Sequence, residues 1–478
     1  MTLRRLLAVL FAFALIASAC GGDDDTESTG DDDGVSAEEP ADEPADEPAD
    51  EPADEPADEP ADEPADEPAD EPADEPAAEL TASWTGVTAD TITVGISMLD
   101  FDLLKELQLS PQGWGDQQLV WQTLIDAVNA NGGVNGRMIE PIYRFYSPLG
   151  TTEAEAACLE LTEDNEVFAV LAGFVGPAEP ANTCITGRGE TVLVGGRQSP
   201  ERLAESTAPW FETATTRTRR LELFMSLVEQ EGLLEGREIA LIGGIQAEEE
   251  FNQARDLLPE FGVEPVVEVL MEAADGDIPA VDAVWEALSE RVDVSGADTA
   301  LIITSTSGNI RGIRNNGLDI DIWTIDNDSL NNLGESVEPA WADGVLTISG
   351  LGDPEAWDHP TVAPCRETFE SANPDVEIVA PADAVEGDER WYTAIMAYCR
   401  YLDAFVQIAT AAGPDLTHDT FREAAYGLGD FELAAQPFNS LGPDKLDAND
   451  TARLGVYDSE IGARGQIVPF SDLIDATP

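Results

Sequence analysis

Apolar and polar residues alternate along the chain with two different periods, and each change of period marks a new element from about residue 88 onward. Residues 91–96 are rich in β-branched side chains, which predicts a strand. Apolar residues recur at helical spacing over 117–131, which predicts a helix that the Gly-rich run 131–136 ends. The alternation continues through strand 138–145, helix 153–162, strand 167–172, helix 178–188 and strand 191–194. This order predicts a parallel sheet flanked by helices.

A second set of alternating elements begins after Phe211. Its predicted helices are 221–231, 248–260, 281–292 and 309–315, and its predicted strands are 238–242, 265–270, 299–303 and 320–325. Two such sets in about 390 residues fit two lobes better than one domain. Ligands of these folds bind at the carboxyl ends of the strands. We therefore expect the ligand site to lie in a cleft between the two lobes.

The first twenty residues have the pattern of a bacterial lipoprotein signal. Arg4 and Arg5 precede an apolar run at 6–16, and small residues lead to Cys20. A helix of eleven residues reaches only about 16 Å, so the run is too short to span a bilayer. We expect residues 1–19 to be a cleaved signal peptide and Cys20 to carry the lipid that anchors the chain outside the cytoplasm. The alternative is an ordinary secretory signal with an incidental cysteine.

Residues 20–83 are predicted to be a disordered linker behind the anchor. Residues 41–76 are nine uninterrupted copies of Ala-Asp-Glu-Pro. A proline at every fourth position prevents helix propagation, and two carboxylates in each repeat repel one another and extend the chain. A solvated spacer is the simplest interpretation, and cation binding by the acidic run is the alternative.

The chain is strongly acidic throughout, with 97 Asp and Glu against 23 Lys and Arg and a formal net charge of −74. Such a field repels nucleic acid and anionic lipid, so we expect no nucleic-acid partner. Besides Cys20, the chain has Cys158, Cys184, Cys365 and Cys399. An even number of cysteines outside the cytoplasm predicts two disulfides, with three connectivities open. The cysteine spacings match no metal motif and there are only two histidines, so we expect no metal and no cofactor.

Several motifs together resemble the branched-chain amino acid (leucine/isoleucine/valine) binding proteins of ABC transporters. The strongest is the turn Asn129-Ala-Asn-Gly-Gly-Val-Asn-Gly-Arg137, preceded by the segment 112–117. The loops 173–177 and 194–201 and the crossing segment 211–214 follow in the family's order. The resemblance implies an α/β fold of two Rossmann-like lobes joined by a three-crossing hinge, the type I periplasmic-binding-protein fold. It places lobe one at 88–211 and 347–412, and lobe two at 212–346 and 413–478.

The resemblance also implies the disulfides and the ligand contacts. All four cysteines fall in lobe one, which favours the local pairs Cys158–Cys184 and Cys365–Cys399. The positions that correspond to ligand contacts are Trp114, Gly176, Ala178, Gly196, Arg197, Gln198, Glu248, Ser305, Thr306, Asp326 and Asp328.

Three of these positions depart from the family's pattern. Arg197 and Gln198 stand where small or hydroxyl side chains are expected, and Glu248 replaces an aromatic residue. We expect Arg197 to bind an anionic group of the ligand and Asp326 or Asp328 to bind an amino group. The alternatives are core packing for Trp114, a surface ion pair for Arg197, and turn positions for the two aspartates.

The resemblance implies a monomeric solute-binding lipoprotein of a bacterial cell membrane. It would capture an amino acid or a related small polar molecule and deliver it to the permease subunits of an ABC importer. A sensor of the same fold is the main alternative. An enzyme is disfavoured because neither His359 nor His418 lies near a nucleophile motif. A structural spacer is suggested only by the repeat.

Overall fold

The computed structural model describes residues 80–478, apart from 108, 109, 111, 274–277, 335, 386 and 463. The expected signal peptide 1–19, the lipid-bearing Cys20 and nearly all of the linker 20–83 lie outside the described residues. The described residues belong to one compact unit. None of their helices combines the length and the apolar character needed to span a bilayer.

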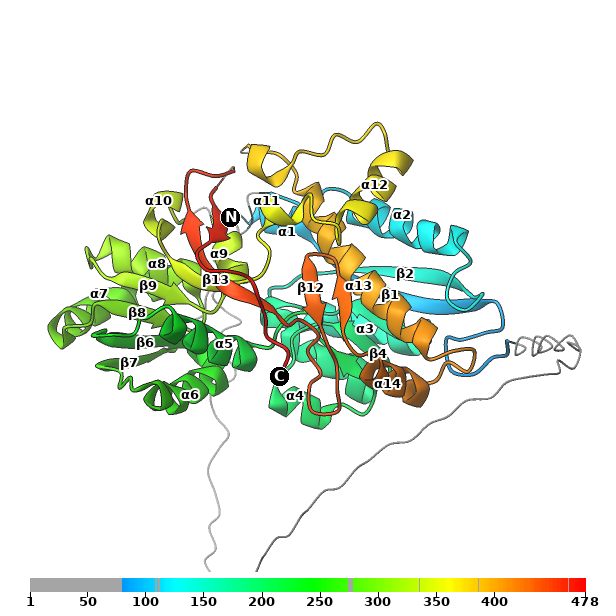
Figure 1. The fold of residues 1–478 in the computed structure, drawn as a ribbon, viewed down its shortest axis with the longest axis horizontal. Helices are drawn as coiled ribbons and strands as arrows, with labels where there is room; N and C mark the ends of the chain where they lie inside the picture. Colours follow the sequence, from blue (N-terminus) through cyan, green and yellow to red (C-terminus); the bar gives the residue numbers. More distant parts are fainter. Residues whose placement is uncertain are drawn as a thin grey trace, which may run out of the picture. The chain divides into compact units, whose positions relative to one another are not determined.

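The first lobe is built on a five-stranded parallel sheet with the strand order β2-β1-β3-β4-β5. Its strands are β1 (Thr91–Leu99), β2 (Met138–Tyr146), β3 (Ala169–Ala172), β4 (Val192–Gly195) and β5 (Trp210–Phe211). Around it lie α1 (Phe101–Glu106), α2 (Gln117–Ala130), α3 (Thr151–Leu159), α4 (Pro200–Glu205), α11 (Asp353–Ala356), α12 (Ala363–Ala372), α13 (Trp391–Ala411) and α14 (His418–Gly427) (Figure 1). The expected α/β order is therefore present from β1 to β5.

Local signals explain how α2 starts and ends. The Asp116 side chain accepts a hydrogen bond from the Leu119 N–H at 3.0 Å and so caps the first turn. At the other end Gly133 has a φ of +67°, and a Cβ there would lie 2.0 Å from the Arg137 carbonyl oxygen. Only glycine fits this position, so the Asn-Gly-Gly turn returns the chain directly into β2.

The second lobe contains a larger mixed sheet with the order β14-β13-β10-β9-β8-β6-β7. Its strands are β6 (Ile239–Gly244), β7 (Val267–Met271), β8 (Thr299–Ile302), β9 (Asp321–Thr324), β10 (Leu346–Ser349), β13 (Thr451–Asp458) and β14 (Gln466–Pro469), and β15 (Ile474–Asp475) pairs with β13. Its helices are α5 (Arg217–Gln230), α6 (Glu248–Leu257), α7 (Ile278–Ser295), α8 (Thr306–Asn315), α9 (Asn327–Asn331) and α10 (Pro339–Ala342). Strands β6 to β10 are parallel, whereas β13 is antiparallel to β10 and β14.

One predicted element differs in kind from the observed structure. The helix expected at 178–188 is a 3-10 segment, Gly176–Ala181, followed by a π-type turn, Cys184–Arg188. Pro180 lies inside the first segment, where its ring and missing N–H prevent a regular α-helix. The apolar residues have the helical spacing that predicted an α-helix, but Pro180 makes the backbone of this segment a 3-10 helix.

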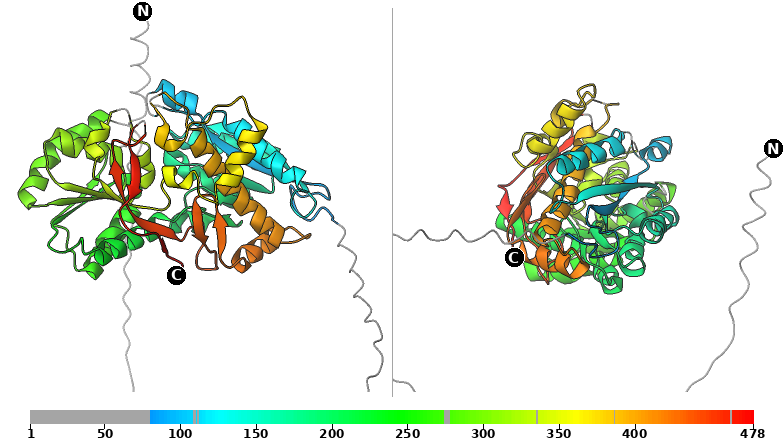
Figure 2. Two further views of the ribbon diagram at one scale, coloured as in Figure 1. Left: turned by 45° about the horizontal axis from the view of Figure 1, so that its top comes forward. Right: turned by 90° about the vertical axis from the view of Figure 1, so that its right-hand side faces the viewer.

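The chain crosses between the lobes three times, and the last third is divided differently from the expected partition. Strand β10 belongs to the second sheet, although 347–349 were expected in lobe one. Helix α14 was expected in lobe two. Instead its Phe421 packs on Phe168 and Phe405 of lobe one, with ring centroids 5.9 Å apart. The small sheet of β11 (Phe431–Leu433) and β12 (Gln436–Asn439) follows α14, so the third crossing comes after β12 (Figure 2). The sequence shows that one face of this helix is apolar, but it does not show which of the two cores that face joins.

Both predicted disulfides are present. Cys158 of α3 is bonded to Cys184, and Cys365 of α12 to Cys399 of α13, with Cα atoms 6.2 Å apart in each pair. Each bond therefore fastens two neighbouring segments within lobe one. The local connectivity expected from the resemblance is confirmed.

Replacing both Cys158 and Cys184 by alanine should lower the free energy of unfolding by about 3 kcal/mol, because the bond closes a loop of 26 residues in the unfolded chain. Urea denaturation of the secreted protein and the double variant measures the difference. Peptide mapping without reductant should recover the two local pairs, and a peptide that joins Cys158 to Cys365 or Cys399 would contradict the structure.

Candidate functional site

The carboxyl ends of the parallel strands of both lobes are the expected ligand-binding edge. In lobe one the loops after β3 and β4 touch each other, because Gly173 and Gly196 both have positive φ. A Cβ on Gly173 would lie 2.8 Å from the Gly196 Cα, so neither loop has room for a side chain there. Arg197 follows Gly196 in the chain and therefore lies at the edge of lobe one that faces lobe two.

Arg197 forms an ion pair across the two lobes. Its Nη2 donates to the Asp328 carboxylate of α9, and its Nη1 lies 3.2 Å from Glu212 Oε1 in the first crossing segment. From lobe two, Arg220 of α5 also reaches Asp328, with 3.4 Å between Nη1 and Oδ2. Asp328 is therefore held between an arginine of lobe one and an arginine of lobe two.

A second chain of ion pairs crosses beside the first. Glu179, whose side chain is only 6% exposed, lies 3.3 Å from Arg202 of α4 and 3.1 Å from Arg217 of α5. Arg217 also lies 3.5 Å from Glu250 of α6. Lobe one thus contributes a buried carboxylate whose partner is a lobe-two arginine. We call the residues of both chains the cleft network: Glu179, Arg197, Arg202, Glu212, Arg217, Arg220, Glu250 and Asp328.

Burial and charge set the protonation of the cleft network. Burial alone would raise the pKa of Asp328, but Arg197 and Arg220 outweigh it and hold that pKa below its usual value. Burial opposes the charge of Arg197, yet Asp328 and Glu212 keep the pKa of its guanidinium above the usual range. Burial raises the pKa of Glu212 to about 7, against the opposing effect of Arg197. The Arg197–Asp328 pair is therefore fully charged at neutral pH.

Aromatic side chains form the lobe-one side of this region. Trp114 lies before α2, with its ring centroid 5.2 Å from Phe101 and 6.0 Å from Tyr398 of α13. The Tyr146 phenol oxygen accepts a hydrogen bond from the Val175 N–H at 3.0 Å, in the loop after β3. Burial raises the pKa values of Tyr146 and Tyr398, so both phenols are neutral. Trp114 combines core packing with a position in the first loop, since it is only partly buried.

Four other predicted residues of lobe one have local roles. Ala178 is fully buried in a core cluster, and Gly176 is exposed at the start of the 3-10 segment with a φ of +62°. Gly196 leaves room for the Asn182 side chain. The Gln198 amide donates to the carbonyl oxygens of Trp210 at 2.9 Å and Leu446 at 3.3 Å, so it fastens the first and third crossings together.

The remaining predicted residues lie in lobe two. Thr306 is buried, and its hydroxyl is 2.9 Å from that of Thr324. Ser305 precedes α8 with a φ of +63°. Asp326 caps α9 by accepting from the Ser329 N–H at 3.2 Å, and Glu248 is exposed at the start of α6. The structure therefore brings Arg197 and Asp328 into contact, and Asp326 precedes Asp328 by two positions in the chain. The side chains of Gln198, Thr306 and Ala178 contact other parts of their own lobe or the crossing segments.

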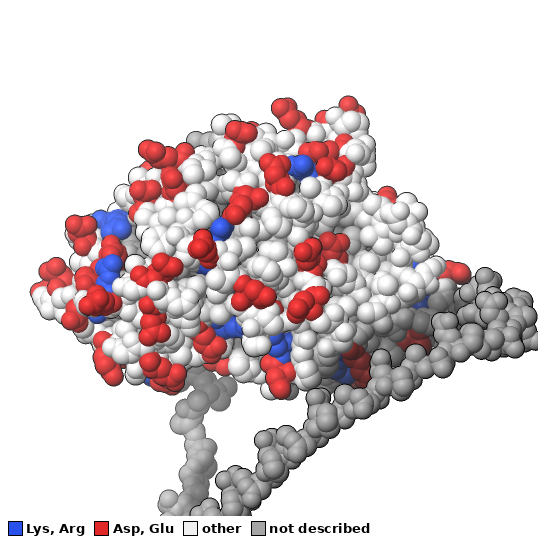
Figure 3. All heavy atoms as spheres, viewed as in Figure 1, with Lys and Arg blue, Asp and Glu red and all other residues white. Residues whose placement is uncertain are grey.

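Sequence reasoning missed most of the cleft network. Arg217, Arg219 and Arg220 are three basic residues among four consecutive positions, directly after the first crossing. In a chain with only 23 basic residues, this run was a usable signal. Figure 3 shows few basic side chains on one face, among more numerous acidic side chains that are scattered over it. Glu179 and Tyr146 gave no such signal, because their partners come from distant segments.

A third contact between the lobes lies at another edge of the cleft. Arg390, just before α13, donates to the Asn332 side chain of lobe two and lies 3.4 Å from Asp353. A small cavity beside it is lined by residues of both lobes, among them Gln112, Asn331, Tyr392 and Arg464. Most of the side chains in its lining are polar.

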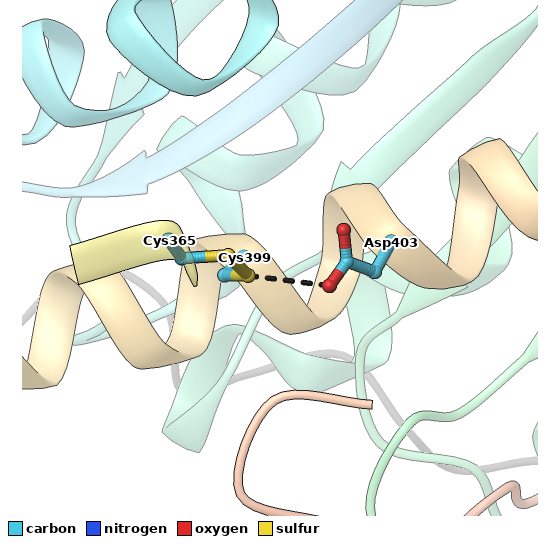
Figure 4. Close-up of side chains that lie close together, drawn as sticks. All are labelled: Cys365, Cys399 and Asp403. Carbon is cyan, nitrogen blue, oxygen red and sulfur yellow. Dashed lines mark hydrogen bonds between the residues drawn. A yellow bond between two sulfur atoms is a disulfide. The ribbon is translucent and has the colours of Figure 1, made fainter. Parts of the chain in front are cut away.

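One group of side chains in the described part of the chain has the proximity of metal ligands: Cys365, Cys399 and Asp403 (Figure 4). The two sulfur atoms are bonded to each other, so neither is a thiolate that could bind a metal ion. Asp403 lies with one carboxylate oxygen 3.2 Å from the Cys399 sulfur, and burial raises its pKa to about 6. The group is a disulfide with a neighbouring acid.

Glu179→Gln should destabilise the protein by about 3 kcal/mol, because two arginines then lose a buried charged partner. Glu163→Gln is the matched control: Glu163 pairs with Arg188 at 2.9 Å, but both side chains are more than half exposed, and we expect a change below about 1 kcal/mol. Urea denaturation at neutral pH measures both. Equal effects in the two variants would show that the cleft network adds nothing beyond a surface ion pair.

Solved structures with the same architecture identify the fold. A solute-binding protein of an ABC transporter from Rhodopseudomonas palustris HaA2, in complex with p-hydroxybenzoic acid, has a TM-score of 0.56 at 15% identity, over 81% of this chain and 98% of that one. The branched-chain amino acid substrate-binding protein LivJ from Streptococcus pneumoniae, in complex with isoleucine, has a TM-score of 0.56 at 15% identity, over 80% of this chain and all of that one.

A type 1 periplasmic binding protein from Bordetella pertussis gives a TM-score of 0.58 at 13% identity, over 80% of this chain and all of that one. No known protein-family profile matches the sequence, and no curated protein matches it. The predicted fold is confirmed: the described part of the chain has the two-lobed α/β architecture of type I periplasmic binding proteins.

Proposed function

We propose that the chain is the extracytoplasmic solute-binding protein of an ABC importer. In this proposal it captures an amino acid or a related small polar molecule between its lobes and delivers it to the permease subunits. Lipid on Cys20 would hold it at the cell membrane, with the acidic repeat as a spacer. The similar structures are solute-binding proteins, and their ligands include isoleucine and hydroxybenzoates, which supports a small carboxylate-bearing ligand. We propose binding, and no catalytic step.

The single observation that carries the proposal is the Arg197–Asp328 pair. It joins the lobes at the carboxyl ends of both sets of strands, where ligands of this fold bind. Arg197 keeps Glu212 as a second partner, and Asp328 keeps Arg220. Either residue can therefore exchange one contact for a ligand group without losing every partner.

The balance of charge in the cleft network favours a zwitterionic ligand. A carboxylate can take the place of Asp328 on Arg197 while an ammonium takes the place of Arg197 on Asp328. Arg197 and Asp328 then each keep a partner of opposite sign, which avoids the cost of leaving the mostly buried Arg197 unpaired. A ligand with only an anionic group would leave Asp328 with Arg220 alone. The geometry thus supports an α-amino acid better than a simple carboxylic acid.

Arg197→Ala should weaken binding of the ligand by about 2–5 kcal/mol, because a carboxylate buried at this position loses its partner. A thermal-shift screen with leucine, isoleucine, other amino acids and 4-hydroxybenzoate first finds the ligand. A ligand at 100 times its Kd adds about 2.7 kcal/mol of stability. Calorimetry on the wild type, Arg197→Ala and Asp328→Asn then measures the affinities.

Arg188→Ala is the matched control, because Arg188 forms an exposed ion pair in the same lobe, 2.9 Å from Glu163. The zwitterion hypothesis expects Asp328→Asn to weaken binding as well. Tighter binding by Asp328→Asn would indicate a simple anion that competes with Asp328. An affinity that neither Arg197→Ala nor Asp328→Asn changes would place the ligand outside the cleft network.

A further inference from the structure

A second cavity lies at the opposite end of the first sheet from Arg197. It has a volume of about 310 Å³, which is within the range of small-molecule sites. Its lining includes Val167, two residues before β3, and Thr191, one residue before β4. These are the amino ends of the strands whose carboxyl ends lead to Gly173 and Arg197. The cavity is therefore separate from the cleft, and its ligand is independent of the one proposed above.

Two aromatic rings, those of Trp84 and His418, are part of the lining of this cavity. Trp84 is 45% exposed, and its ring lies 4.8 Å from the His418 ring, centroid to centroid. His418 in turn lies 5.8 Å from Phe168 of the core. The turn that carries Trp84 is closely docked, since a Cβ on Gly86 would lie 2.3 Å from the Phe168 backbone nitrogen. Trp84 is thus an exposed aromatic face on a firmly held backbone.

The polar groups of the cavity are mostly hydrogen-bond acceptors. The hydroxyls of Thr162, Thr191 and Thr207 each donate to a backbone carbonyl oxygen, at 2.9, 2.8 and 3.1 Å, which leaves their oxygen lone pairs for a ligand. The backbone N–H groups of Gly189, Thr191, Thr207 and Ala208 also donate to carbonyl oxygens within the lobe. These oxygen atoms favour a ligand that brings its own donors.

The charge of the cavity is negative. Glu190 is exposed in the lining, and no Lys or Arg is among the lining residues. Burial and Arg422 lower the pKa of His418 to about 4, so its ring is neutral. The net charge of −74 raises the local concentration of cations around the whole molecule. An aromatic face beside a carboxylate, in a lining without Lys or Arg, is a suitable site for an organic cation.

We propose that this cavity binds an organic cation with N–H donors, an alkylammonium or guanidinium ion, against the Trp84 ring with a donor on the Glu190 carboxylate. The same chemistry occurs in free diamines and in the lysine or arginine side chain of another polypeptide. The lone pairs of Thr162, Thr191 and Thr207 accept the remaining donors. The cleft network takes no part in this binding.

Titration calorimetry on the folded protein tests the proposal with putrescine and agmatine. The neutral isostere of putrescine, 1,4-butanediol, serves as the control ligand. We expect at least one cation to bind with a millimolar or tighter Kd and the diol not to bind. Trp84→Ala and Glu190→Gln should each weaken that binding about fivefold or more. Glu155→Gln, an exposed acid of α3 outside the cavity, should leave it unchanged.

An acetylated and amidated Gly-Arg-Gly peptide distinguishes the two sources. Binding as tight as that of agmatine indicates the side chain of a partner polypeptide, and binding at least tenfold weaker indicates a free small cation. The proposal would be overturned if neither putrescine nor agmatine bound, or if 1,4-butanediol bound as tightly as they do. It would also be overturned if Asp328→Asn abolished cation binding while Trp84→Ala and Glu190→Gln left it intact. None of these depends on the ligand of the cleft.

Discussion

The ion pair between Arg197, whose side chain is mostly buried, and the half-exposed Asp328 is the constraint on which the relation of the two lobes depends. Removing the Arg197 charge from water is costly, and Asp328 of the other lobe together with Glu212 compensates that cost. Glu179 and Arg217 repeat the arrangement beside it. Paired charges therefore join the two lobes at this edge. Such an interface can exchange partners with a polar solute, because its contacts are of the kind that the solute itself offers.

The use of arginine follows from the same constraint. Arg197 and Arg217 each contact two carboxylates at once, which a planar guanidinium with five donors does better than an ammonium. The one lysine in the crossing region, Lys445, donates instead to the carbonyl oxygens of Ser440 and Ala448 and lies 3.2 Å from Asp450. Few positive charges are present in this acidic chain, and many of them lie where the segments of the two lobes meet.

The first sheet has different chemistry at its two ends. Strands β3 and β4 are four residues long, so about 13 Å of extended chain separates the loops at the cleft from the residues that line the cavity near Trp84. The cleft end contains paired arginines and carboxylates, whereas the cavity offers hydroxyl and carboxylate oxygens without a fixed cation. A short rigid strand is thus able to position two unlike sites in one lobe.

The sequence alone determined the order of the elements, because the periods of 2 and 3.6 residues and the turn at 131–137 are local properties. The family resemblance carried by its motifs implied the fold and the local pairing of the four cysteines, and it placed Arg197 and Asp328 at strand ends. Only the tertiary structure decided which core α14 joins, since the apolar pattern of 418–427 does not identify the surface on which Phe421 packs. Only the tertiary structure decided the partners of Arg197, because Glu212 and Asp328 are 15 and 131 residues away in the chain. Trp84 and His418 meet for the same reason: side chains that are distant in sequence become neighbours only when the sheet has brought their segments together.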